Sequence, residues 1–150
     1  ETMLGRGEIA YKYYKTILPP TKNKMADIHL TECYIYSQFI TGKSNQNFGR
    51  ARNSWLTGTA AWNFAAITGY ILGVRPDYNG LVIDPCIPKK WKHFEVRRVF
   101  RNATYDIHVK NPNGVNKGVK GLKVDGMRIE GNVAPVFSDG KVHKVEVELG

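Results

Sequence analysis

The sequence has little cysteine, no long apolar run and no recognisable leader. Its two cysteines, Cys33 and Cys86, stand alone without CxxC or CxxH spacing, so neither a zinc site nor a disulfide framework is indicated. No stretch of about 18 residues is apolar enough to span a bilayer, and no basic-then-apolar segment opens the chain. We therefore expect no metal, no membrane partner and a reducing, cytoplasmic compartment.

The sequence also lacks a basic run, although its formal net charge is +9. Lysine and arginine outnumber aspartate and glutamate by 9 to 5 in residues 1–80 and by 13 to 8 in residues 81–150. Nucleic-acid-binding proteins usually gather their positive charge on one face or along one helix. The even distribution indicates a solvated surface, so we expect no nucleic-acid partner. A basic surface also suits small substrates that carry phosphate.

The composition changes near residue 80. Valine occurs once before Gly80 and twelve times after it, while twelve of the seventeen aromatic residues lie in the first 80 positions. Because the branched side chain of valine favours strands, this shift predicts a helical domain over residues 1–80 and a β domain over residues 81–150. The expected fold class is therefore α+β.

Three helices are expected in the first domain. Apolar residues at i, i+4 and i+8 predict a helix over residues 8–18, which ends at a pair of prolines. A second helix is expected over residues 30–41, because a glycine follows it. The third helix begins near Thr57 or Thr59 and is apolar on every side, so we expect it to be buried.

The second domain shows the alternation that is typical of half-buried strands. Apolar and polar residues alternate over residues 104–109 and again over residues 144–149. Asp125-Gly126 is a two-residue turn that requires positive φ, and residues 138–140 mark another tight reversal. We expect six to eight strands in an antiparallel two-sheet β-sandwich, similar to a jelly roll.

The candidate functional residues lie where the third helix begins, in the sequence "NSWLTGTAAWNF". The first amides of a helix have no acceptor within the helix, so another group must satisfy them. A threonine hydroxyl can cap the helix, with Gly58 present for tight packing. Alternatively, the Thr57 hydroxyl and the unshielded Gly58 amide bind an anion at the positive end of the helix. The pattern alone leaves both interpretations open.

The same residues suggest a family. "NSWLTGTAAWNF", followed by "YILGVRPDYNGLVIDPCIPKKWKHFEVRRVFRNATYDI", resembles the C-terminal region of the cellobiose phosphorylases and their relatives, the chitobiose and cellodextrin phosphorylases. "GRGEIAYKYYKTILPP" and "YIYSQFITGK" are similar to the same family, so the resemblance covers nearly the whole chain. It implies the last helices of an (α/α)6 barrel followed by the C-terminal β-sandwich, with the remainder of the polypeptide upstream of Glu1.

The resemblance also implies an activity. Members of this family are cytoplasmic, homodimeric glycosyltransferases that split β-linked disaccharides with inorganic phosphate and invert the anomeric centre. Cellobiose would give α-D-glucose 1-phosphate and glucose, and chitobiose or cellodextrins are the alternative substrates. The family motif implies phosphate contacts for Thr57 and Gly58, and the glutamine of "YSQ" implies a sugar contact for Gln38. Phosphate is a co-substrate here, and no cofactor is expected.

No catalytic residue is expected in this chain, because the motifs that hold the family's aspartate general acid and its other phosphate ligands are absent from the sequence. The isolated chain is therefore expected to be inactive. Glu32 lies six residues before Gln38, and either a position near the pocket or a solvent-facing or capping role is open to it. We expect Trp55, Trp62 and Trp91 in the core rather than stacked on sugar rings.

A second class of function is a non-catalytic carbohydrate-binding module. Such a module would bind glucans without turnover and would expose aromatic side chains on one face of its sheet. The predicted strands offer few such aromatics.

Overall fold

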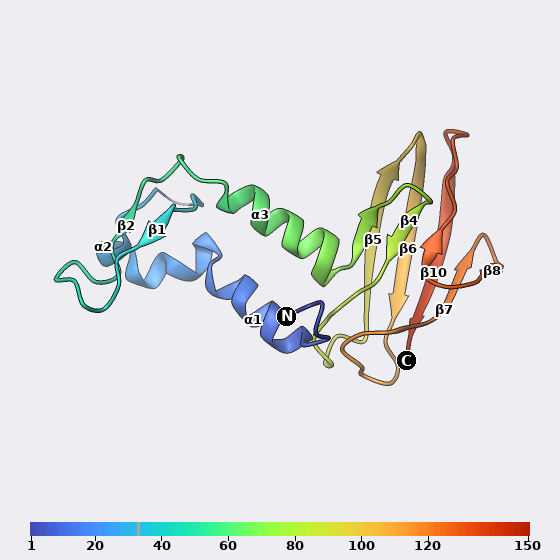
Figure 1. Ribbon diagram of the computed structural model, residues 1–150, viewed down its shortest axis with the longest axis horizontal. Helices are drawn as coiled ribbons and strands as arrows, with labels where there is room; N and C mark the ends of the chain where they lie inside the picture. Colours follow the sequence, from blue (N-terminus) through green and yellow to red (C-terminus); the bar gives the residue numbers. More distant parts are fainter. Residues whose placement is uncertain (33) are drawn as a thin grey trace. The chain divides into compact units, whose positions relative to one another are not determined.

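The computed structural model describes residues 1–32 and 34–150 and divides them into two compact units (Figure 1). The sheet unit comprises Glu1–Tyr11 and Ile67–Gly150. The hairpin unit comprises Lys12–Ala66. The described chain is thus α+β, with its β strands concentrated in the sheet unit.

The division into two compact units does not test every prediction made from the sequence. Cys33 lies outside the described residues. The domain boundary at residue 80 and the barrel and sandwich architectures stay predictions, because a compact unit of this chain need not coincide with a domain of a longer protein. Within the described part of the chain, every helix is too short or too polar to cross a bilayer. The same residues contain no cluster of three His, Cys, Asp or Glu side chains suited to a metal ion.

The first predicted helix is confirmed as α1, Gly7–Thr16. An acidic residue, Glu8, lies in its first turn and a basic residue, Lys15, in its last, so both charges complement the helix dipole. In the sheet unit, the Glu8 carboxylate accepts hydrogen bonds from the backbone amide of Lys89 at 2.9 Å and from Asn116 Nδ2 at 2.6 Å. These two bonds fix the start of α1 on the sheet unit.

The predicted second helix over residues 30–41 is wrong. The 3-10 helix η1, Pro19–Met25, and the short helix α2, Ala26–His29, are followed by the two-residue strand β1, Phe39–Ile40. Leu30 and Tyr34 take left-handed backbone conformations, with φ of 54° and 65°, which end a right-handed helix. β1 instead pairs with β2, Ala51–Arg52, in an antiparallel hairpin.

The third helix forms as α3, Thr59–Ala65, and continues as the π-helix η2, Ala66–Ile71. The second of the two predicted starts, Thr57 or Thr59, is the one observed, but the expected burial is wrong. Trp62 is 78% exposed and Phe64 is 64% exposed, and Asn63 is the buried residue of α3. An apolar pattern shows which faces favour burial, whereas burial also requires a second element to cover each face.

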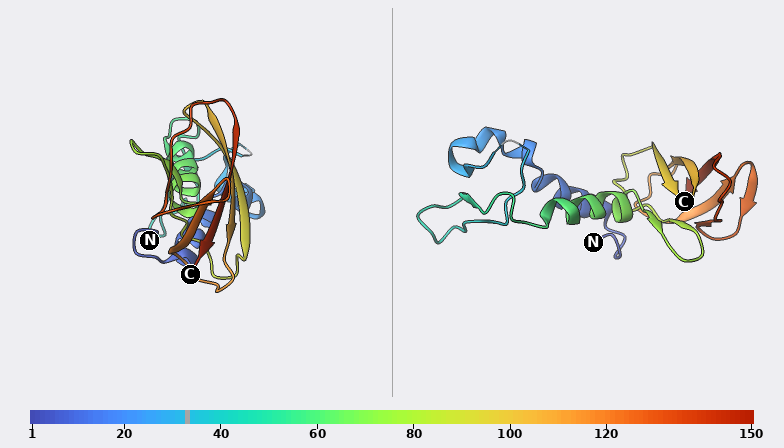
Figure 2. Two further views of the ribbon diagram at one scale, coloured as in Figure 1. Left: turned by 90° about the vertical axis from the view of Figure 1, so that its right-hand side faces the viewer. Right: turned by 90° about the horizontal axis from the view of Figure 1, so that it is seen from above.

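The sheet unit contains two sheets. The five-stranded sheet has the order β5-β6-β10-β7-β8, and the three-stranded sheet has the order β3-β4-β9. β4 and the five strands of the large sheet are labelled in Figure 1, and Figure 2 shows the ribbon from two further sides. Their bounds are Val74–Pro76 (β3), Leu81–Ile83 (β4), His93–Phe100 (β5), Ala103–Lys110 (β6), Val119–Val124 (β7), Met127–Ile129 (β8), Val133–Ala134 (β9) and Val142–Leu149 (β10).

The prediction of a wholly antiparallel arrangement is wrong for the centre of the large sheet. β10 runs parallel to β6, with Val142 opposite Thr104 and Glu148 opposite Lys110. On its other side, β10 pairs antiparallel with β7. The chain between β6 and β10 contains β7, β8 and β9, which gives the long connection that a parallel pair requires.

The predicted turn at Asp125-Gly126 is confirmed. It joins β7 to β8, and both residues have positive φ, 49° and 83°. The alternation over β6 and β10 is confirmed as well, because every second residue of each strand is buried. Tyr105 is fully buried, donates its hydroxyl hydrogen to the Pro135 carbonyl at 2.8 Å and accepts the Phe137 amide at 3.1 Å. The core of this unit therefore draws on β6, β10 and the segment after β9.

Candidate functional site

Thr57 lies just before α3, in the hairpin unit, and its hydroxyl belongs to a small hydrogen-bonded network. Thr57 Oγ1 accepts the backbone amide of Thr59 at 3.1 Å and lies 2.7 Å from Thr59 Oγ1, where either oxygen can donate. Thr59 Oγ1 also lies 3.5 Å from the Ser37 carbonyl, a longer and weaker contact. The network gives the capping role that the sequence allows. When Thr59 donates at the shorter distance, the hydrogen of the Thr57 hydroxyl is available to a further acceptor.

Gly58 has an ordinary backbone conformation, with φ of −80° and ψ of 0°. A side chain is compatible with these angles, so positive φ does not explain the glycine. An added Cβ would lie 3.3 Å from Trp62 Cδ1, which belongs to an exposed side chain that is able to move. Neither backbone strain nor tight packing therefore requires glycine at this position.

Gln38 is held at the entrance of the β1–β2 hairpin. Its backbone amide donates to the Arg52 carbonyl at 3.1 Å, and its Oε1 accepts Asn53 Nδ2 at 2.7 Å. These bonds fix the side-chain oxygen and direct the amide nitrogen, a donor of two hydrogens, away from Asn53. The side-chain oxygen of Gln38 is thus held by Asn53, while the capacity to donate hydrogen bonds stays with its amide nitrogen.

Gln38 and Thr59 line one pocket, which we call the α2 pocket. Its volume is about 250 Å³, and it lies entirely within the hairpin unit. Thr57 and Gly58 are not among its lining residues, although Thr59 connects them to it. The lining residues are Ile17, Pro19, Lys22, His29, Ile35, Tyr36, Ser37, Gln38, Phe39, Ile40 and Thr59.

Two supporting residues, Asn63 and Asn53, were not predicted from the sequence. Asn63, the buried polar residue of α3, donates to the Tyr36 hydroxyl at 2.7 Å and so ties the helix to the segment that carries Gln38. Asn53 orients Gln38 from β2's side of the hairpin. An asparagine inside an otherwise apolar helix is a signal that could have identified Asn63. The partners themselves are 15 and 27 residues apart in sequence, so no local pattern shows them.

Glu32 does not have the properties of a general acid. Trp55 Nε1 donates to Glu32 Oε1 at 3.1 Å. A hydrogen bond from its own backbone amide, followed by those of Ser54 and Trp55, lowers the pKa of this carboxyl. A general acid needs a raised pKa to hold its proton near neutral pH. The expectation that Trp55 lies in the core is wrong, since its side chain is 70% exposed.

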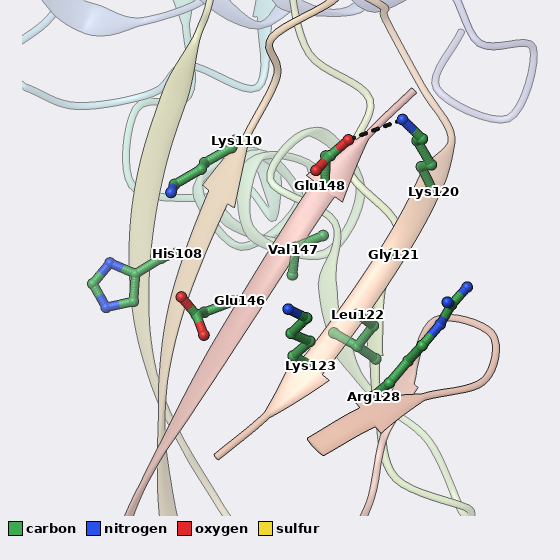
Figure 3. Close-up of a pocket in the computed structure, with 10 residues that line it drawn as sticks. All are labelled: His108, Lys110, Lys120, Gly121, Leu122, Lys123, Arg128, Glu146, Val147 and Glu148. Carbon is green, nitrogen blue, oxygen red and sulfur yellow. Dashed lines mark hydrogen bonds and ion pairs between the residues drawn. The ribbon is translucent and has the colours of Figure 1, made fainter. Parts of the chain in front are cut away.

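A second hollow, of about 410 Å³, lies on the outer face of the five-stranded sheet (Figure 3). Charges of both signs alternate across its strands, and Glu146 lies between its register partners His108 and Lys123. Lys120 and Glu148 form an ion pair at 3.1 Å beside Gly121. Among the described residues that line this hollow there is no Phe, Tyr or Trp, the side chains on which a carbohydrate-binding module usually stacks a sugar ring.

Comparison with known proteins gives consistent matches. Residues 1–73 match the family model described as the glycosyl hydrolase 94 superfamily, catalytic domain. The whole chain is 46% identical to the N,N'-diacetylchitobiose phosphorylase of Vibrio proteolyticus, of which it covers 19%. Over 99% of its length it is 38% identical to the solabiose phosphorylase of Paenibacillus borealis, of which it also covers 19%.

A third relative, the N,N'-diacetylchitobiose phosphorylase of Vibrio furnissii, is 45% identical over 95% of the chain, and the chain covers 18% of its length. The chain thus spans about a fifth of the length of these curated relatives. The resemblance drawn from the sequence motifs is confirmed at the level of the family. The chain belongs to the glycosyl hydrolase 94 superfamily.

Proposed function

We propose that the intact protein that contains this chain is an inverting phosphorylase. It cleaves a β-linked disaccharide with inorganic phosphate and releases an α-glycosyl 1-phosphate and a free sugar. Membership of the phosphorylase family supports the reaction class. The observation that carries the role of this chain is Gly58, whose backbone conformation does not require glycine and whose amide follows the hydroxyl of Thr57.

The reaction needs an acid on one face of the sugar and a nucleophile on the other. Phosphate is already anionic, so only the acid must come from a side chain. The Thr57 hydroxyl and the Gly58 amide donate to phosphate oxygens and hold the phosphate below the anomeric carbon, where proximity and fixed donors lower the barrier. Gln38 holds the sugar. The general acid comes from the remainder of the polypeptide.

The disaccharide is N,N'-diacetylchitobiose in the first instance, because two relatives at 46% and 45% identity carry that name. Cellobiose is the second candidate, because "SWLTGTAAWNF" is most similar to the cellobiose enzymes. Longer cellodextrins are the third candidate substrate. The intact enzyme uses no cofactor apart from phosphate as co-substrate and works as a cytoplasmic homodimer.

The test is phosphorolysis by the full-length protein and by its Thr57→Ala and Thr57→Ser variants. We expect release of an α-sugar 1-phosphate, identified by NMR, from at least one of the three substrates. Thr57→Ala raises the KM for phosphate roughly 10- to 100-fold, which corresponds to a lost hydrogen bond to a charged group, and changes the KM for the disaccharide less. Thr57→Ser keeps the hydroxyl and most of the phosphate affinity.

Two outcomes would overturn the proposal. If the full-length protein releases no sugar phosphate from any β-linked disaccharide, the reaction class is wrong. If Thr57→Ala weakens the use of both substrates equally, Thr57 is a helix cap and does not contact phosphate.

A further inference from the structure

His29, the last residue of α2, is buried in an unusual setting. Its side chain is only 7% exposed, whereas the neighbouring Ile28 is 53% exposed. Isoleucine is buried more often than histidine in folded proteins, so we would expect Ile28 to be the buried residue of this pair and His29 the exposed one. The structure shows the reverse. Leu30, the C-cap of α2, has a left-handed backbone conformation, and its amide donates a hydrogen bond to the Ala26 carbonyl. This cap fixes the helix with His29 turned inward.

The ring of His29 has no hydrogen-bond or ion-pair partner among residues 1–32 and 34–150. Nearly all buried polar side chains are hydrogen-bonded, so an unpaired one requires an explanation. In the described part of the chain, Arg98 Nε is the one unpaired side-chain polar atom that is fully enclosed by protein. The ring nitrogens of His29 are therefore not sealed in the core. His29 is one of the residues that line the α2 pocket.

The lining of the α2 pocket is amphipathic in the way that a sugar ring is. Isoleucines, a proline and a phenylalanine form its apolar wall, while Ser37, Gln38 and Thr59 contribute polar groups beside His29. A pyranose presents apolar ring faces and hydroxyl groups at its edge. The volume of about 250 Å³ lies below the roughly 300–1,000 Å³ of pockets for drug-sized ligands, so it suits one sugar unit.

We propose that His29 is a substrate-binding residue whose ring nitrogen hydrogen-bonds a hydroxyl group of one sugar unit seated in the α2 pocket. Gln38 lines the same pocket, and among residues 1–32 and 34–150 its side-chain amide nitrogen has no partner, so it binds the same unit. The inference rests on the proposed function, because it assigns the sugar to the disaccharide substrate. It adds a specificity-determining residue from a helix that precedes the Gln38 motif.

The test uses the full-length protein with His29→Leu, His29→Gln and the control His93→Leu. His29→Leu removes the hydrogen bond at similar volume, so kcat/KM for the disaccharide falls about tenfold while the KM for phosphate stays within about twofold. His29→Gln retains a nitrogen donor and recovers most of the loss. His93 is exposed on β5 in the sheet unit, and its replacement leaves both constants unchanged.

Each of the following results would overturn the inference. In the first result, His29→Leu leaves kcat/KM for the disaccharide unchanged. In the second, His29→Leu lowers kcat/KM for the disaccharide and raises the KM for phosphate by a similar factor. His29→Gln fails to recover activity at a temperature where both variants are folded, which shows that His29 only fills space.

A separate measurement distinguishes failure of the inference from failure of the proposed function. Saturation-transfer NMR with glucose and N-acetylglucosamine reports sugar binding without turnover. If the full-length protein performs no phosphorolysis but binds a monosaccharide that His29→Leu no longer binds, the pocket assignment stands and the reaction class fails. If His29→Leu binds both sugars as the unmodified protein does, the pocket assignment is wrong.

Discussion

At the scale of single residues, Gly58 separates a structural from a functional role for the start of α3. Its φ of −80° accepts alanine, and the added methyl group meets only the exposed side chain of Trp62. We expect Gly58→Ala to change the free energy of unfolding by less than about 1 kcal/mol, the range seen at helix N-caps. The methyl group also covers the amide that we assign to phosphate. The KM for phosphate should therefore rise roughly tenfold or more.

A matched control for this substitution is Gly42→Ala. Gly42 lies in the hairpin loop of the same unit, has open space where the methyl group would be added and is not assigned to the site. Phosphate kinetics and thermal denaturation of both variants in the full-length protein check the prediction. An unchanged KM for phosphate in Gly58→Ala would show that the amide is not a phosphate donor.

The residues of the site differ in how far the sequence predicts them. Thr57 and Gly58 stand at a helix start, where local rules already suggest caps and anions. Gln38 followed only from the resemblance to a family. His29 and Asn63 escaped prediction because their roles depend on burial beside segments distant in sequence, and a lone polar residue in a sequence does not show which side it faces.

At the scale of elements, a buried histidine connects two turns of the sheet unit. His143 Nδ1 lies 2.7 Å from Asp125 Oδ2, and its Nε2 lies 3.1 Å from Asp139 Oδ1. Since both ring nitrogens face carboxylates, the doubly protonated ring donates to both. The ring also stacks on Phe137 with centroids 3.6 Å apart. We call this group the His143 clamp. It joins the β7–β8 turn to the segment that leads into β10.

The His143 clamp predicts a pH dependence of local stability. The hydrogen bond with Asp125 raises the pKa of His143 above its value in the unfolded chain, about 6.5. The contribution of His143 to stability is therefore complete at pH values below about 6.5 and is lost as the pH rises through the folded pKa. Bonds from His143 to Asp125, and from the Lys141 amide and His143 to Asp139, lower the pKa values of these carboxyls. The contribution of these two carboxyls to stability is complete at pH values above about 3.9, the pKa of aspartate in the unfolded chain, and is lost as the pH falls through their folded pKa values.

Hydrogen exchange at the Lys144 amide, which donates to Asp125 Oδ1 at 2.8 Å, measures the His143 clamp directly. After correction for intrinsic exchange, we expect greater protection at about pH 5.5 than at about pH 8 in the full-length protein. His143→Gln keeps a polar group but no titratable charge, so it lowers protection at the acid pH and removes the difference. Equal protection at both pH values in the unmodified protein would contradict the clamp.

The elements themselves were predictable to different degrees. The strands β6 and β10 and the Asp125-Gly126 turn followed from local patterns, because a period of two and a positive-φ pair act within a few residues. The parallel pairing of β10 with β6 did not, because alternation within a strand does not identify its neighbour. The missed β1–β2 hairpin has the same cause, since its strands are two residues long and carry no periodicity.

At the scale of the whole molecule, the two units differ in how completely they bury their apolar residues. The sheet unit encloses Tyr105, Ile107 and Leu149 completely. In the hairpin unit, Leu56 and Trp62 are largely exposed. The chain spans about a fifth of the length of its curated relatives.

The proposed division of roles predicts that the 150-residue chain alone does not catalyse phosphorolysis. Phosphate and sugar contacts orient the substrates, but departure of the sugar still needs a protonated acid at the glycosidic oxygen. Glu32, the carboxylate closest in sequence to Gln38, has a lowered pKa and is bound to Trp55, so it does not hold a proton near neutral pH. We expect no sugar 1-phosphate from the purified chain with N,N'-diacetylchitobiose or cellobiose, under conditions where the full-length protein turns over. Product formation by the chain alone, abolished by Glu32→Gln, would place the acid within these residues and contradict the division of roles.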